Sequence, residues 1–158
     1  RLWDRIDAET SSAGPPGPMP PPDAVQSRAA NGVPAVLERW LPEGLDAVRW
    51  GSLAPGVRQF RLSGVDTGGG SLRLLQIAPG TTIAHHGHSG SELTLVLRGS
   101  YSDEVGRFCA GDLADLDVDV AHQPVADSSE PCICLIATDA RLRFSSVLGR
   151  VVQPFIGI

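Results

Sequence analysis

From Arg49 onward the hydrophobic residues come in short stretches, each ended by glycine or proline before it reaches the length of an ordinary helix. The chain has 18 glycines and 13 prolines among 158 residues. Within stretches such as QFRLSG (59–64) and SLRLLQIAPG (71–80), apolar and polar residues alternate. Alternation with a period of two is typical of a strand with one buried face. About eight to ten such strands predict an all-β fold, a small antiparallel barrel or jelly roll.

The residues before these strands predict two further parts. RLWDRIDAET (1–10) has apolar residues at helical spacing, and we expect it to be the tail of a truncated N-terminal helical domain. Residues 11–31 open with SSAGPPGPMPPPD, whose composition sustains neither helix nor sheet, and are expected to form a Pro/Gly-rich linker. The main domain is expected over residues 32–158. It begins with a short helix in VPAVLERWLPEG (33–44), where a proline stands near each end.

The charge balance narrows the range of partners. The formal net charge is −5, and the 13 lysines and arginines form no basic cluster, so direct binding of nucleic acid is not expected. No apolar run approaches the roughly 20 residues that span a bilayer, and no secretory signal is recognisable. We therefore expect a cytoplasmic protein that does not contact membranes.

The cysteines do not predict a disulfide framework. There are three of them, an odd number, and no CxxC pair. Cys132 and Cys134 stand two residues apart in a predicted strand, so their side chains share a face. Ideal strand geometry holds such residues about 6.5 Å apart, too far for an easy mutual disulfide. We expect both thiols to be buried and reduced.

Three of the four histidines crowd into AHHGH (84–88), and a glutamate follows four residues later. If residues 86–92 form one strand, His86, His88 and Glu92 project from the same face. Two imidazoles and a carboxylate that converge are typical of a transition-metal site. His85 is one residue out of phase and is expected to point away. The alternative is a solvated turn in which the imidazoles bond to backbone carbonyls; the carboxylate makes this alternative the weaker one.

The spacing around these residues resembles the first motif of the cupin superfamily. That motif reads glycine, five residues, His-x-His, three or four residues, glutamate, six residues, glycine. Here it is complete, from Gly80 through His86, His88 and Glu92 to Gly99. The resemblance implies a cupin-type antiparallel β-barrel.

The second cupin motif is only partly kept. GDLADLDVDVAH retains the opening Gly111 and ends in His122, which falls at the position of the family's fourth metal ligand. Asp117 and Asp119 stand where proline and glycine are usual, and Ala126 stands where asparagine is usual. The resemblance therefore rests mainly on the first motif.

The cupin resemblance implies four metal ligands: His86, His88, Glu92 and His122. Three imidazoles and one carboxylate suit zinc, iron, manganese or nickel. If the four close a tetrahedron, zinc is the natural occupant. An octahedral site with water would instead indicate iron or manganese catalysis.

A closer resemblance extends over nearly the whole chain. The block AHHGHSGSELTLVLRGSYSDEVGRFCAGDLADLD (84–117) and the later strand CICLIATDARLRF (132–144) resemble the ChrR family of anti-sigma factors. Members of that family join an N-terminal zinc-binding helical domain, which sequesters an extracytoplasmic-function sigma factor, to a cupin domain that responds to singlet oxygen or related oxidants. The resemblance implies that this chain is the cupin domain with its linker. Its sigma-factor partner would bind through the N-terminal domain that is missing here.

In this interpretation the cupin is a sensor, and no catalytic residue is expected. Oxidation of a ligand imidazole, or of the possible redox-sensing pair Cys132 and Cys134, would loosen the metal and shift the domain to another state. Two alternatives stay open. The domain could be a cupin metalloenzyme such as an iron dioxygenase, or a sensor that binds a small organic molecule inside the barrel.

Overall fold

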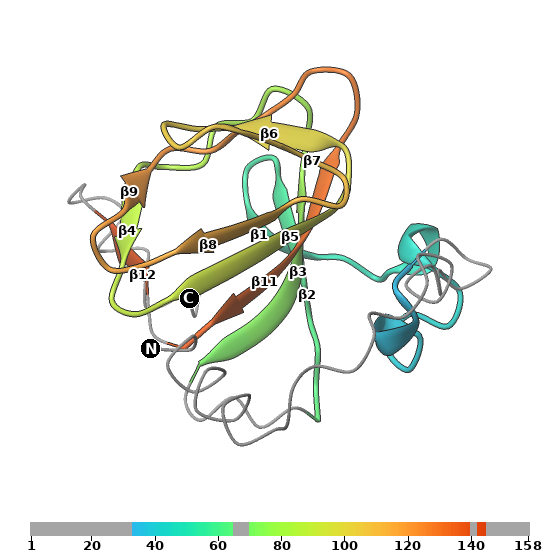
Figure 1. The fold of residues 1–158 in the computed structure, drawn as a ribbon. Coiled ribbons are helices and arrows are strands. Elements are labelled where there is room, and N and C mark those ends of the chain that lie inside the picture. The colour runs from blue at the N-terminus through green and yellow to red at the C-terminus, as the bar shows by residue number, and fades with distance from the viewer. Residues whose placement is uncertain (1–32, 65–69, 140–141, 145–158) are drawn as a thin grey trace, which may run out of the picture. The chain divides into compact units, whose positions relative to one another are not determined.

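The computed structural model describes residues 33–64, 70–139 and 142–144 (Figure 1). The predicted helical tail 1–10 and the predicted linker 11–31 lie outside these ranges. The chain divides into two compact units, and the boundary in the sequence falls between Val48 and Arg49. Each unit is described by itself.

In its described part, residues 33–48, the first unit contains two short 3₁₀ helices, η2 (Ala35–Leu37) and η3 (Leu45–Ala47). The predicted helix in residues 33–44 is therefore a single 3₁₀ turn followed by further turns, not a regular α-helix. Two prolines leave only seven residues between them, too few to offset the entropy of nucleating an α-helix. Among the described residues, no helix is long and apolar enough to cross a membrane.

The described residues of the second unit form twelve strands. They are β1 (Gly51–Ala54), β2 (Val57–Arg61), β3 (Ser71–Ile77), β4 (His86–His88), β5 (Glu92–Arg98), β6 (Ser100–Ser102), β7 (Arg107–Cys109), β8 (Leu113–Leu116), β9 (Ala121–His122), β10 (Val125–Ala126), β11 (Cys132–Thr138) and β12 (Leu142–Phe144). Every strand pair is antiparallel. The all-β prediction is confirmed.

The strands form three hydrogen-bonded sheets, as expected of a jelly roll. One sheet has six strands in the order β1-β2-β3-β11-β5-β8, and two have three strands, in the orders β10-β6-β7 and β12-β4-β9. In Figure 1 the sheet of β4, β9 and β12 lies at one end of β5, β8 and β11. Strands from the chain's middle and its end thereby come together around one interior.

The interior face of the six-stranded sheet is set by period-two alternation. Along β5 the buried residues are Glu92, Thr94 and Val96, and the leucines between them are half-buried. Register carries the same face onto β11, where Cys134 pairs with Val96. This face contributes to a core of buried residues: Val57, Ile77, Val96, Tyr101, Ala126, Cys132 and Cys134. The polar side chains on this face, Glu92 and Thr94, are therefore buried next to an apolar core.

Candidate metal centre

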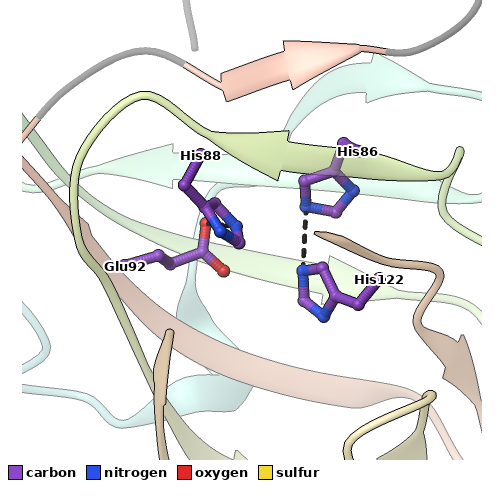
Figure 2. Close-up of side chains that lie close together, drawn as sticks. All are labelled: His86, His88, Glu92 and His122. Atoms are coloured by element: carbon purple, nitrogen blue, oxygen red, sulfur yellow. Dashed lines mark hydrogen bonds and ion pairs between the residues drawn. The ribbon is translucent and has the colours of Figure 1, made fainter. Parts of the chain in front are cut away.

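The four side chains that the cupin resemblance selects lie together in the second unit (Figure 2). His86 and His88 come from β4, His122 from β9 and Glu92 from the first position of β5. One donor atom from each lies within 4.8 Å of the others. All four residues are at most 5% exposed. Such a cluster of buried nitrogen and oxygen donors can hold a transition-metal ion.

The cluster does not come from one strand. Residues 89–91 turn the chain between β4 and β5, so Glu92 approaches from the six-stranded sheet whereas the histidines belong to another sheet. Period-two alternation holds for His86 and His88. Residues 86–92 do not form one strand, so Glu92 joins the two histidines from β5 and not by alternation along β4. The donors therefore converge from two sheets, which surrounds an ion on more than one side.

The tautomers of two histidines follow from their outer partners. His86 Nδ1 is 2.8 Å from the Ala84 carbonyl oxygen, and His122 Nδ1 is 2.7 Å from Asp103 Oδ2. A carbonyl and a carboxylate only accept hydrogen bonds, so both Nδ1 atoms carry the proton. The two Nε2 atoms face each other at 3.1 Å. In the neutral imidazoles both of these atoms present lone pairs, and a cation between them removes the repulsion.

Protonation of His86 is not a favourable way to supply this positive charge. Burial, with a smaller contribution from the nearby His122 and His88, lowers the pKa of His86 to about 4, against the opposing effect of the bond to Ala84. A neutral imidazole is the form that binds metal. The electrostatics of the cluster thus favour a metal ion over an imidazolium.

His88 supplies independent support. Neither of its ring nitrogens has a hydrogen-bond partner among the described residues, although the residue is 2% exposed. Its Nε2 atom is 3.6 Å from Glu92 Oε2, too far for a hydrogen bond. Glu92 is oriented by its other oxygen, which accepts a hydrogen bond of 3.1 Å from Thr94 Oγ1. A buried imidazole with an unused lone pair beside an oriented carboxylate fits metal coordination.

The turn between β6 and β7 holds the strand that carries His122. Asp103 is completely buried at its side chain; one oxygen bonds to His122, and the other accepts the backbone N–H groups of Val105 and Gly106. Next to it, Glu104 Oε2 accepts the backbone N–H of Gln123 at 2.7 Å. From sequence alone, SDEVG (102–106) indicates only a hairpin connection. The two adjacent acids before a glycine were the available signal, but spacing alone could not pair them with β9.

Replacing Asp103 with alanine is expected to weaken metal binding by about 10- to 100-fold, the usual cost of losing a carboxylate behind a histidine ligand. The physical reason is that His122 Nδ1 loses its acceptor and the ring loses its fixed tautomer. Competition with a chromophoric chelator measures the change. Asp112→Ala is the matched control, because Asp112 also accepts a backbone N–H in a turn, that of Cys109, but is exposed. It precedes β8 at the end opposite to Leu116, the residue that pairs with Glu92. Equal affinities for the two variants would contradict the assigned role.

The other residues that the sequence singled out are His85 and the two cysteines, Cys132 and Cys134, and none of them belongs to the metal cluster. His85 is exposed. Cys132 and Cys134 are buried and unbridged, with their sulfur atoms 3.4 Å apart, much closer than ideal strand spacing suggests. The hydrogen bond to Cys132, together with burial, holds the pKa of Cys134 well above its ordinary value. Cys134 is therefore a protonated thiol in the core.

Comparison with known proteins agrees with this architecture. A family model described as the ChrR cupin-like domain matches residues 44–141. The chain is 48% identical over 132 residues to the anti-sigma-E factor ChrR of Cereibacter sphaeroides, and the match covers 83% of this chain but only 61% of that protein.

Solved structures show the same fold. The chain is similar to the crystal structure of Rhodobacter sphaeroides SigE in complex with the anti-sigma ChrR, with a TM-score of 0.63, 36% identity and coverage of 87% of this chain and 76% of that chain. An acetylacetone dioxygenase from Acinetobacter johnsonii matches with a TM-score of 0.51 and 14% identity, over 60% of this chain and 66% of that chain. The second likeness concerns the fold alone. The family model and the 48% identity to ChrR show the family. This chain belongs to the ChrR cupin-like domain family.

Proposed function

We propose that this chain is the metal-binding sensor part of a cytoplasmic anti-sigma factor. The observation that carries the proposal is the 48% identity to an anti-sigma factor over 83% of the chain. The partner is an extracytoplasmic-function sigma factor, bound through an N-terminal domain of the full-length protein. Residues 11–31 serve as the tether and residues 32–158 as the cupin domain. The net charge of −5 supports a protein partner over nucleic acid.

The proposed ligands are His86, His88, Glu92 and His122, and the proposed metal is zinc. Zinc accepts imidazole and carboxylate donors in a compact arrangement without a preference imposed by d electrons. When bound, it would link the sheet of β4 and β9 to the six-stranded sheet by bonds to both. Because metal binding is coupled to folding, the domain's stability depends on each of the four donors.

Sensing follows from that dependence. Oxidation of a ligand imidazole removes a lone pair from the metal, and oxidation of Cys132 or Cys134 introduces polar atoms into the core behind it. Either change weakens the site and shifts the domain toward a looser state. A shift of about 1.4 kcal/mol already changes a conformational ratio tenfold. The full-length protein would then release its sigma factor.

The test uses the full-length protein in complex with its sigma factor. Purified complex is exposed to singlet oxygen from a photosensitiser, and free sigma factor is measured by transcription from its promoter. We expect the wild-type complex to release its sigma factor only after exposure. The complex that carries His122→Gln should lack the cupin metal from the start and should release its sigma factor without singlet oxygen. If release from the His122→Gln complex needs singlet oxygen as it does in wild type, the metal centre is rejected as the sensor. The double variant C132S/C134S, if it responds normally, removes the thiols from the mechanism.

Metal analysis separates this proposal from catalysis. Stoichiometric, colourless zinc supports the regulator, whereas bound iron with oxygen consumption would support a dioxygenase, and a co-purified organic molecule would support a small-molecule sensor. The carboxylates that could act as acid or base along β8 and the loop after it are all exposed: Asp112, Asp115, Asp117 and Asp119. Their exposure favours a solvated edge over a catalytic wall.

A further inference from the structure

Tyr101 carries a buried hydroxyl that the metal ligand set leaves unexplained. The residue lies in β6 and is 3% exposed. In the described part of the chain its hydroxyl has no hydrogen-bond partner, a property it shares with the ring nitrogens of His88. For His88 a metal ion accounts for the unused lone pair. Buried hydroxyls in proteins almost always have a partner, so the Tyr101 hydroxyl needs its own explanation.

Packing alone does not require the hydroxyl. The Tyr101 ring stacks on Phe108, with ring centroids 5.0 Å apart and an interplanar angle of 24°. Its other neighbours belong to the apolar core and include Val96 and Cys134. A phenylalanine would make the same stacking and core contacts without burying a polar group. The oxygen atom therefore points to a role in binding.

Tyr101 faces the interior that holds the metal centre. It shares the buried core with Val96, which lies on the same face of β5 as Glu92. It also stands two residues before Asp103, which bonds to the ligand His122. Burial raises the pKa of Tyr101 far above its ordinary value, and the nearby Cys134, Asp103 and Glu92 add to this effect. Glu92 is a proposed ligand, and Asp103 holds the ligand His122. A tyrosine in this environment stays protonated, so it can only offer its proton to an acceptor.

We propose that the Tyr101 hydroxyl donates a hydrogen bond to a small monodentate ligand, a water or a small monoanion, that binds the metal as its fifth donor. The inference rests on the proposed metal centre. Three neutral imidazoles and one carboxylate around a divalent ion leave a net charge of +1, which favours an anionic fifth ligand. Tyr101 is thus a positioning residue that selects a hydrogen-bond-accepting ligand from the side of the core where Cys134 lies.

The test uses the chain loaded with Co²⁺, whose visible spectrum reports coordination number, and azide as the probe anion. Wild type, Tyr101→Phe and Ser100→Ala are each titrated with sodium azide. Ser100 is the matched control, because it is the neighbouring buried hydroxyl in β6 but donates to Asp127, away from the cluster. We expect wild type and S100A to bind azide alike and Y101F to bind it about 10- to 100-fold more weakly, the effect of one hydrogen bond to a charged acceptor.

Several results distinguish this inference from the metal centre itself. If wild type takes up one Co²⁺ per chain but its spectrum does not respond to azide, or if Y101F binds azide like wild type, the inference fails and the metal centre stands. If wild type takes up no Co²⁺, the metal centre fails, and this inference fails with it. Should Y101F not fold, the spectrum of azide-free wild type decides. Weak, five-coordinate bands support a fifth ligand, and intense tetrahedral bands overturn it.

Discussion

Replacing His88 with glutamine is expected to abolish stoichiometric metal binding and to remove the stabilisation that the metal provides. At a free metal concentration 1,000-fold above the dissociation constant, that stabilisation is about 4 kcal/mol. The physical reason is that His88 is 2% exposed, yet neither of its nitrogens has a hydrogen bond to the described protein residues. Its ring contacts His86 and His122, which are members of the same cluster. Metal content after dialysis, with thermal unfolding in the presence and absence of zinc, measures both effects.

The neighbouring histidine provides the matched control. His85 is exposed and out of phase with the cluster, so His85→Gln should keep wild-type metal content and a wild-type response of the unfolding temperature to zinc. The metal-free forms of H88Q and wild type should differ by no more than about 1 kcal/mol, since no hydrogen bond is lost. A large loss of stability in metal-free H88Q would show that His88 is a structural core residue. Retention of metal would remove it from the ligand set.

The strand pattern was predictable because burial imposes alternation directly on the sequence. QFRLSG and SLRLLQIAPG became parts of β2 and β3, and the motif around Glu92 became β5 with its buried residues at every second position. The division into three sheets was not predictable in this way. Alternation shows which face of a strand is buried, but strand partners distant in sequence are chosen by packing, and packing leaves no periodic signal.

The metal cluster shows the same division between local and long-range information. His86 and His88 share a face because they are two residues apart in β4. Glu92 and His122 join them only because β5 lies opposite β4 and because β9 pairs with β4, where His86 is opposite His122. The family motif supplied His122, since no spacing rule links residues 36 positions apart. Asp103 lies within the block that resembles the ChrR family, but nothing in the sequence pairs it with His122, and only the structure reveals that contact.

The distance between the two cysteine sulfur atoms could not be predicted from strand spacing alone. Strand spacing correctly placed Cys132 and Cys134 on one face and correctly predicted free thiols. It did not predict that the sulfur atoms would approach to 3.4 Å. Each sulfur can swing by rotation about one bond, and the register of β11 against β5 shifts between Ile133 and Cys134. Ideal strand spacing therefore does not fix the distance between the two sulfur atoms.

Gly80 and Gly99, at the two ends of the first motif, are required for different physical reasons. A pair of alanine substitutions tests the two reasons separately. Gly80 and Gly99 both have positive φ, 69° and 70°. A Cβ on Gly80 would meet nothing within 4 Å, whereas a Cβ on Gly99 would lie 2.7 Å from the Pro131 carbonyl oxygen and 3.1 Å from the Cys132 Cα. Gly99 joins β5 to β6 where the chain passes from one sheet to another. It needs both the backbone conformation and the absence of a side chain.

Gly99→Ala is therefore expected to destabilise the metal-free chain by about 4 kcal/mol, the sum of left-handed strain and overlap with backbone atoms that cannot easily move. Gly80→Ala carries only the strain and should cost about 1 kcal/mol. Urea unfolding followed by tryptophan fluorescence compares the two. Because β6 carries Tyr101 and leads into the turn of Asp103, G99A should also weaken metal binding, while G80A should not. Equal destabilisation by the two substitutions would mean that the contact with Pro131 relaxes freely and that Gly99 is required for its conformation alone.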